Sequence, residues 1–274
     1  MADEGVRPQA DEQSLIESWK AEERAPFSGW YFSTLKGRMR EEQPPWDYAS
    51  LARGLFRSIG SRGSALDLGT GGGELLSSLG PFPERTFATE GHPPNVPVAM
   101  KRLRPLGVTV VEADSAEKIP FDDETFDVVL SRHSAFCAEE VFRILKRGGV
   151  FLTQQVPADN LRDLAGLLGC VRGEESGPSG WSLGQAVSRL EAAGFSLEDS
   201  REWKGKAVFL DVGALVYFLK AVPWVVEGFS VERYRAGLLD LQKRIDAGLR
   251  LSFTVSRFML ICRKRTSLPF PAKD

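Results

Sequence analysis

The stretch ALDLGTGGGE, residues 65–74, decides how the chain must fold around it. A short apolar run leads into four glycines within residues 69–73. Because glycine destabilises strands and helices, such a cluster is typical of a turn at which another group approaches the main chain closely. The stretch therefore predicts a strand, followed at once by a turn that forms part of a binding site.

Short β-rich and helical segments alternate downstream of Gly63. The β-rich segments are SALDLG, RTFATE, VTVVEAD, FDVVLSR and VFLTQQV, and the helical segments between them are GELLSSLG, PNVPVAMKRLRPLG and AEEVFRILKRGG. Alternation of this kind predicts an α/β fold with a parallel sheet and helices on both faces. Residues 196–203 and 251–265 also have strand character.

The remaining segments flank this α/β core. We expect a disordered tail at 1–10, a helical and aromatic lid segment at 11–62, the core at 63–206 and 248–266, and a helical cap insertion at 207–247. The lid segment holds a group of aromatic residues, namely Phe27, Trp30, Tyr31, Phe32, Trp46 and Tyr48. So much aromatic surface must be buried against the core or against a ligand.

Composition excludes several classes of function. The 274 residues carry a net charge of −2, which disfavours a nucleic-acid partner. Two histidines and three scattered cysteines give no metal-binding pattern. The polar N-terminus lacks an apolar signal region, and the most apolar later stretch is interrupted by Asp211, Lys220 and Pro223, so we expect a cytoplasmic protein without a membrane span.

The glycine turn does not fit the two common phosphate-binding patterns. A dinucleotide fingerprint, G-x-G-x-x-G, would place glycine where Glu74 stands, and a carboxylate suits a pyrophosphate poorly. A P-loop would continue with G-K-[S/T], which does not follow here. The spacing is instead G-x-G-x-G.

LDLGTGGGELL resembles the first motif of class I S-adenosylmethionine-dependent methyltransferases, and the chain is similar to the type 11 members of that family. The stretches EADSAEKIPFDDETFDVVLSR and EEVFRILKRGGVFLTQQV also resemble the family, so that the match covers residues 63–156 in order. The resemblance implies a Rossmann-like sheet of seven strands, mostly parallel with an antiparallel last strand. It also implies S-adenosyl-L-methionine as cofactor.

The resemblance assigns cofactor contacts to particular positions. Glu90, at the end of the second strand, would bind both ribose hydroxyls, and Asp114 would meet the adenine amino group. Asp67 would hold loop amides or the cofactor's amino group. The complete predicted set is Asp67, Gly69, Thr70, Gly71, Gly73, Glu90, Gly91, Asp114, Ser115, Ser131 and Arg132. For Glu90 the alternative is a surface carboxylate, and for Asp114 it is a cap of the loop.

His133 follows the fourth strand, close to the expected position of methyl transfer. It is the candidate catalytic residue, either as a base or as a group that orients the acceptor, and a structural histidine is the alternative. Arg132 could bind the methionine carboxylate or an anionic acceptor, or make a structural ion pair. One of Gln154 and Gln155 should point toward the pocket, because successive side chains of a strand alternate between faces.

The methyl acceptor should be a small, apolar or aromatic molecule. Such an acceptor would suit a pocket lined by Phe209, Tyr217, Phe218 and Trp224, although these residues could equally pack the cap onto the sheet. Three other functions remain open: a cofactor-binding but catalytically silent regulatory protein, a protein or RNA methyltransferase, and an NAD-linked oxidoreductase.

Overall fold

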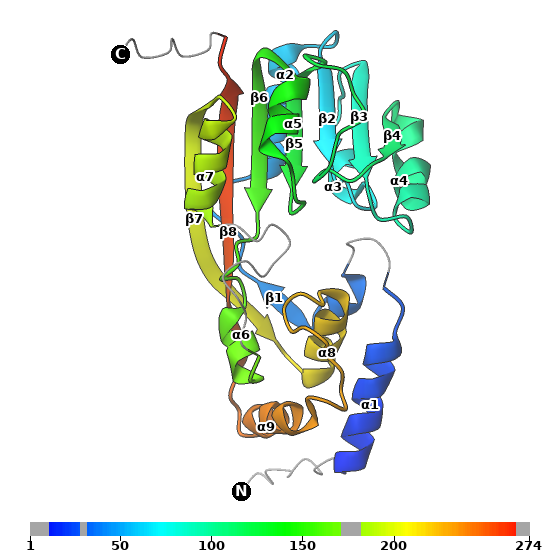
Figure 1. The fold of residues 1–274 in the computed structure, drawn as a ribbon. Helices are drawn as coiled ribbons and strands as arrows, with labels where there is room; N and C mark the ends of the chain where they lie inside the picture. Colours follow the sequence, from blue (N-terminus) through cyan, green and yellow to red (C-terminus); the bar gives the residue numbers. More distant parts are fainter. Residues whose placement is uncertain (1–10, 28–31, 171–181, 267–274) are drawn as a thin grey trace, which may run out of the picture.

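The computed structural model describes residues 11–27, 32–170 and 182–266 (Figure 1). The predicted tail at 1–10 lies outside the described residues, as do Trp30 and Tyr31. The described residues form one eight-stranded sheet. Its strands are β1 (Met39–Glu41), β2 (Ser64–Leu68), β3 (Arg85–Glu90), β4 (Thr109–Glu112), β5 (Phe126–Arg132), β6 (Leu145–Gln155), β7 (Phe195–Phe209) and β8 (Leu251–Lys264). They lie in the order β1-β7-β8-β6-β5-β2-β3-β4.

The pairing directions confirm the predicted fold class. β2 pairs in parallel with β3 and β5, β3 with β4, and β5 with β6, whereas β8 runs antiparallel to both β6 and β7. The sheet has one strand more than predicted. The short β1 pairs antiparallel with the end of β7, with Met39 opposite Phe209.

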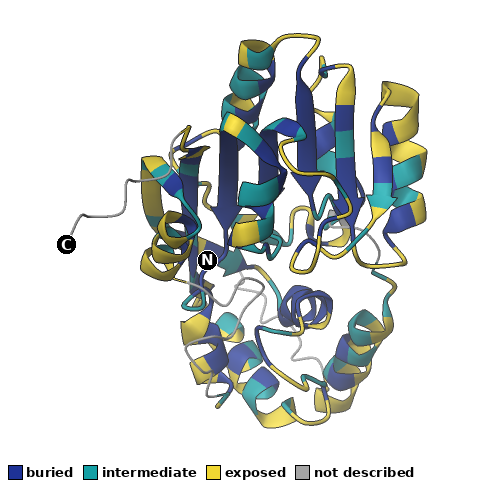
Figure 2. Ribbon diagram, turned by 45° about the horizontal axis from the view of Figure 1, so that its top comes forward, coloured by how far each residue is buried: buried dark blue, intermediate teal, exposed yellow. Residues whose placement is uncertain are grey.

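Helices cover both faces of the sheet. The helices α2 (Tyr48–Ile59), α3 (Glu74–Ser77) and α4 (Val96–Leu103) share an apolar core with Ala65, Val128 and Leu130 of the strands. On the other face, α5 (Ala138–Ile144) and α7 (Leu183–Ala192) pack against Leu66 and Val129. Successive strand residues point into these two cores in turn, as expected for a sheet that is buried on both faces. The central strands are accordingly coloured as buried, in dark blue, in Figure 2.

A third apolar core forms the lower half of the molecule in Figure 1. Here α1 (Glu12–Arg24), α6 (Arg162–Leu167), α8 (Val212–Ala221) and α9 (Arg235–Asp246) pack around the far ends of β7 and β8. β7 continues through residues 207–209 because Ala207 and Phe209 point into this core and pair with β1. The helices of the expected insertion therefore begin only at Val212.

One arginine ties the lid segment to the cap. Arg38 donates to both carboxylate oxygens of Asp211, at 3.0 and 2.6 Å, and also pairs with Glu22 of α1 at 2.8 Å. Asp211 in turn caps α8 by accepting from the Ala214 amide at 2.7 Å. Nine of the ten residues of α8 are buried, yet no helix within the described ranges is long and apolar enough to cross a bilayer.

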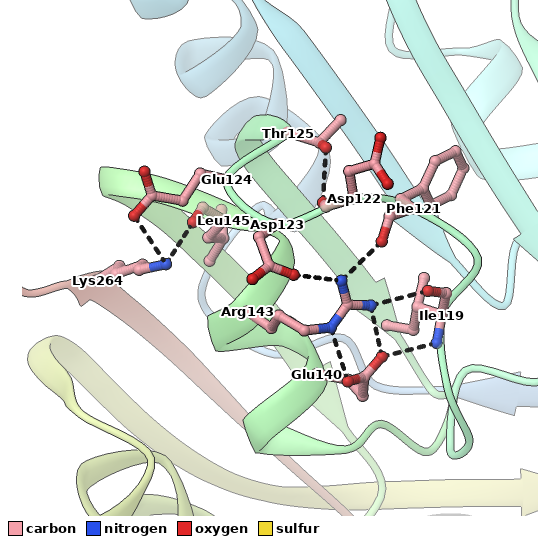
Figure 3. A network of polar contacts seen from close by, with 10 residues as sticks. All are labelled: Ile119, Phe121, Asp122, Asp123, Glu124, Thr125, Glu140, Arg143, Leu145 and Lys264. Carbon is pink, nitrogen blue, oxygen red and sulfur yellow. Dashed lines mark hydrogen bonds and ion pairs between the residues drawn. The ribbon is translucent and has the colours of Figure 1, made fainter.

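A clamp on α5 fixes the long loop between β4 and β5 (Figure 3). Arg143 donates to the carbonyl oxygens of Ile119 and Phe121 at 2.9 and 2.7 Å and pairs with Asp123 at 2.9 Å. Glu140 holds the Arg143 guanidinium at 2.7 Å and accepts from the Ile119 amide at 2.9 Å. The clamp therefore holds residues 119–123 of this loop against α5.

Replacing the clamp residue should loosen this loop. We expect Arg143→Ala to lower the free energy of unfolding by about 2 kcal/mol, because several charge-assisted hydrogen bonds are lost together. Urea denaturation measures the change. The control is Arg147→Ala, whose side chain is 71% exposed and meets only Glu124 at 3.3 Å; it should cost less than about 0.5 kcal/mol. Equal effects of both substitutions would contradict the clamp.

Candidate active site

The glycine turn after β2 has the backbone geometry that the sequence predicts. Gly69, Gly71 and Gly73 all adopt positive φ angles, of 62°, 63° and 76°. The Thr70 amide donates to the Thr89 carbonyl at 2.8 Å, which fixes the turn against β3. A Cβ atom at Gly69 would overlap the Ser134 hydroxyl, so only glycine lets the two segments come this close.

Glu90 binds the same turn from the end of β3. One carboxylate oxygen accepts from the Gly71 amide at 2.6 Å, and the other accepts from the His92 amide at 2.8 Å. The side chain is buried, and this burial raises the pKa of Glu90 above its usual value although both hydrogen bonds favour the charged form. Glu90 is thus a buried acid held at the carboxyl edge of the sheet.

Asp114 lies beside Glu90 at the start of the clamped loop. The Ala113 amide donates to the Glu90 carbonyl at 3.1 Å, and a Cβ atom at Gly91 would come within 3.0 Å of the Asp114 Cα. The exposed Asp114 carboxylate accepts from the Ala116 amide at 2.8 Å through one oxygen. Ser115 is buried and donates to the Ala135 carbonyl at 2.7 Å.

Asp67 is a buried carboxylate at the end of β2, only 8% exposed. Burial raises its pKa to about 7, and this effect outweighs the lowering by the nearby Arg132. Two more polar atoms close to Asp67 are buried. Among the described residues neither the Tyr48 hydroxyl nor the Thr70 hydroxyl makes a hydrogen bond of good geometry, although the Thr70 hydroxyl lies near enough to Asp67 to lower the pKa of this carboxylate. Unpartnered buried groups around a carboxylate are typical of a site built for a polar ligand.

Arg132 and His133 follow at the end of β5. Burial lowers the pKa of the Arg132 guanidinium, although Tyr48, Glu41 and Asp67 act in the opposite direction. His133 has a φ of 59°, held by a hydrogen bond of 2.8 Å from its amide to the Gln154 carbonyl. Its ring Nε2 lies 3.0 Å from the side-chain nitrogen of Gln154.

These residues border a cavity of about 370 Å³ between the sheet and the cap. Five of the predicted site residues line it, namely Asp67, Gly69, Thr70, Arg132 and His133. The other seven, Gly71, Gly73, Glu90, Gly91, Asp114, Ser115 and Ser131, do not line the cavity. Ser131 instead donates to the Ser134 carbonyl at 3.2 Å. Glu74, the residue that breaks the dinucleotide pattern, also lines the cavity and pairs with Arg102.

The far wall of the cavity is apolar and comes mainly from the lid and cap. It includes Phe32, Phe218, Val222, Trp224 and Val225. Phe218 and Trp224 were predicted to line a pocket. Phe209 and Tyr217 do not line the cavity and are buried in the core of the cap, which is the alternative that the sequence left open for these aromatic residues.

Sequence reasoning missed a polar cluster on this wall. Arg257 pairs with Glu41 at 2.6 Å and donates to the Asn160 side chain at 2.9 Å, and all three residues line the cavity. The available signal was an arginine in the middle of the mostly apolar strand β8. Nothing in the sequence pairs it with Glu41, because β1 and β8 are both neighbours of β7 rather than of one another.

The hydrogen bonds of Gln154 and Gln155 show which of these two glutamines faces the site. Gln154 contacts His133 and lines a second hollow with Trp46, Tyr48 and Arg132. Gln155 points to the opposite face, where its amide donates to Thr153 at 2.7 Å. No cluster of metal-ligating side chains occurs in the part of the chain that the structure describes.

Comparison with known families identifies the central segment. Residues 66–153 match the profile of the family described as "Methyltransferase domain". Residues 66–153 thus match a methyltransferase domain, and the resemblance expected for residues 63–156 is confirmed over this segment.

Curated relatives match this chain over a segment of similar length. A probable phthiotriol/phenolphthiotriol dimycocerosates methyltransferase 2 from Mycobacterium ulcerans is 36% identical over 101 residues, which cover 34% of this chain and 38% of the relative. The uncharacterized methyltransferase YcgJ from Bacillus subtilis is 30% identical over 96 residues, covering 32% and 38%. The match therefore spans well under half of the length of these relatives.

Solved structures share the fold over a longer part of the chain. A putative methyltransferase from Bacillus halodurans C-125 covers 79% of this chain and 100% of its own, with a TM-score of 0.57 and 22% identity. YcgJ from Bacillus subtilis covers 80% and 100%, with a TM-score of 0.58 and 18% identity. These similarities confirm the Rossmann-like methyltransferase fold.

The hydrogen bonds of the buried Glu90 carboxylate should contribute to the stability of the fold. We expect Glu90→Gln to lower the free energy of unfolding by about 1–3 kcal/mol, because the new amide nitrogen would face a backbone N–H with no acceptor nearby. Denaturant titration followed by tryptophan fluorescence measures it. Glu84→Gln, at an exposed position just before β3, is the matched control and should change stability by less than about 0.5 kcal/mol. A neutral Glu90→Gln would mean that the two hydrogen bonds do not hold the turn.

Proposed function

We propose that the protein is an S-adenosylmethionine-dependent methyltransferase that acts on a small apolar or aromatic molecule. The observation that carries this proposal is the pair of carboxylates, Asp67 and Glu74, that border the cavity on either side of the glycine turn. Arg132, which also lines the cavity, suits a carboxylate of a ligand, and the carboxylates beside the turn attract positively charged groups. S-adenosylmethionine carries two such groups, an ammonium and a sulfonium.

The residues present fit this cofactor. An ionised carboxylate offers about four acceptor positions. Glu90 uses two of them on backbone amides and also meets the Asn95 side chain, so that ribose hydroxyls would share the carboxylate with Asn95. Asp114 has one oxygen that is engaged by Ala116, and its side chain is exposed. The unpartnered Tyr48 and Thr70 hydroxyls beside Asp67 could bind the polar end of an amino acid.

We assign the contacts accordingly. Glu90 holds the ribose hydroxyls, Asp114 the adenine amino group and Asp67 the ammonium group of the methionine part. Arg132 binds the methionine carboxylate. The turn at Gly69–Gly73, with Thr70, Gly71, Gly91, Ser115 and Ser131, shapes the surrounding backbone.

Bound there, S-adenosylmethionine would supply a methyl group on an electrophilic sulfonium. The chain's own contribution is largely to position the acceptor, since an aligned pair reacts without a bimolecular encounter. His133 borders the cavity between the turn and the apolar wall, so that it can contact the acceptor. The apolar wall also excludes water from the reacting atoms.

The acceptor class rests on the shape and lining of the cavity. About 370 Å³ is enough for a small molecule, and the wall of Phe32, Phe218 and Trp224 favours an apolar or aromatic body. The relative from Mycobacterium ulcerans is named for phthiotriol and phenolphthiotriol dimycocerosates, and this name also supports an apolar acceptor.

Calorimetric titration of S-adenosylhomocysteine, with NADH in a parallel experiment, tests the cofactor. We expect saturable binding in the micromolar range, about −8 kcal/mol, for the first ligand and none for the second. Glu90→Ala should abolish the signal without unfolding the protein. Binding of NADH alone would contradict the proposal and favour an oxidoreductase.

The pH dependence of this affinity tests the role of Asp67. Its pKa of about 7 means that the free protein must release a proton below pH 7 before the carboxylate can hold an ammonium group. Affinity should therefore fall about tenfold between pH 8 and pH 6. Asp67→Asn should bind weakly with a flat profile over this range. A flat profile in the unmodified protein would remove Asp67 from the assignment.

Methyl transfer itself distinguishes an enzyme from a silent binding protein. We expect that incubation with methyl-labelled S-adenosylmethionine and a fractionated metabolite extract transfers label to a compound that partitions into organic solvent. Glu90→Ala should transfer none. Label found only in protein or RNA would contradict the small-molecule acceptor, and cofactor binding without transfer from any fraction would favour the silent protein.

A further inference from the structure

A buried chain of hydrogen bonds connects the lid segment to His133. The indole nitrogen of Trp46 lies 2.7 Å from the side-chain oxygen of Gln154, and the side-chain nitrogen of Gln154 lies 3.0 Å from Nε2 of His133. Trp46 and Gln154 are buried, with 6% and 3% of their surface exposed. The two side chains are therefore largely shielded from solvent.

The chemistry of the donors fixes the direction of this chain. An indole N–H can only donate, so the atom of Gln154 that faces Trp46 must be the amide oxygen. The amide nitrogen then faces His133, and because it too can only donate, Nε2 of the ring must accept. A neutral imidazole that accepts at Nε2 carries its proton on Nδ1.

Gln154 also fixes the position of the ring. The His133 amide donates to the Gln154 carbonyl at 2.8 Å and holds the residue at a positive φ of 59°, a conformation that few residues other than glycine adopt. Main chain and side chain of His133 are thus bound to one residue of β6. Nδ1 makes no hydrogen bond with any residue that the structure describes, and His133 borders the cavity.

The surroundings keep the ring neutral. Burial lowers the pKa of His133 well below its usual value, and the positive charges of Arg132 and Arg257 lower it further. The carboxylate of Glu41, which lines the cavity with His133, is engaged by Arg257 at 2.6 Å. A proton added to Nε2 would also meet the amide nitrogen of Gln154, a second donor.

We propose that His133 orients the acceptor by donating its Nδ1–H to an acceptor oxygen, and that Trp46 and Gln154 are positioning residues that hold it in this tautomer. This inference rests on the proposed methyltransferase function and selects one of the two roles predicted for His133. A general base needs a free lone pair, and the only one on this ring is occupied by Gln154.

This role of His133 restricts the chemical class of the methyl acceptor. Beside its apolar body the molecule carries an oxygen that accepts a hydrogen bond, such as a carbonyl, carboxylate or phenolate oxygen. The methylated atom delivers no proton to His133. An acceptor that lacks such an oxygen would leave the Nδ1–H without a partner when the cavity is filled and should therefore bind more weakly.

Nitrogen NMR of the full chain labelled with ¹⁵N-histidine tests the tautomer directly. The chain has only two histidines, and His92→Asn identifies the signals of His133. We expect a neutral ring with the proton on Nδ1, unchanged from pH 5.5 to 8. A proton on Nε2, or a titration within this range, would overturn the proposal. No cofactor is present in this experiment, so its failure is distinct from a failure of S-adenosylhomocysteine to bind.

Two substitutions test the positioning residues. Trp46→Phe removes the donor that orients the Gln154 amide, so His133 should show a mixture of tautomers. Trp19→Phe, at an equally buried tryptophan in α1, is the matched control and should leave the signals unchanged. Gln154→Glu offers an acceptor to Nε2 and should shift the proton onto it. A folded Trp46→Phe or Gln154→Glu variant with the original signals would contradict the roles of these residues.

Discussion

The parallel pairing of β2 with β3 and β5 is the constraint on which the site depends. Because the three strands run in the same direction, Asp67, Glu90 and Arg132 all arrive at one edge of the sheet. The 2.6 Å bond from the Gly71 amide to the Glu90 carboxylate then fixes the glycine turn across this edge. The bond from the Ala113 amide to the Glu90 carbonyl holds the neighbouring Asp114 beside the same edge. A shift in this pairing would separate the acids and remove the site.

The sequence was sufficient for features that depend on local rules. Strand–helix alternation predicted the α/β sheet, and the glycine cluster predicted a turn with positive φ angles beside an acid. These signals are strong because few residues other than glycine fit such a turn and because parallel strands expose their carboxyl ends together. The family resemblance placed Glu90 and Asp114 next to one another, and the structure brings the backbone segments that carry them into contact.

The sequence could not predict contacts between segments that are distant along the chain. The three-residue strand β1 has no local signal, and it exists because β7 continues past the rest of the sheet and offers it an edge. The pair of Arg257 and Glu41 depends on that placement. Among four aromatic residues expected at the pocket, helical periodicity alone could not separate Phe218 from the neighbouring Tyr217, which packs into the cap. The contact of Trp46 could not be predicted either, because its hydrogen bond to Gln154 joins residues more than one hundred positions apart in the sequence.

The central claim is that S-adenosylmethionine binds at the carboxyl ends of the strands, in contact with Asp67, Glu90 and Asp114. A crystal structure of the protein with S-adenosylhomocysteine tests it most directly. The account predicts the adenine amino group at Asp114, both ribose hydroxyls at Glu90 and the ammonium group at Asp67, with His133 facing the adjacent apolar cavity. A ligand seated away from Glu90, Asp114 and Asp67 would contradict these assignments.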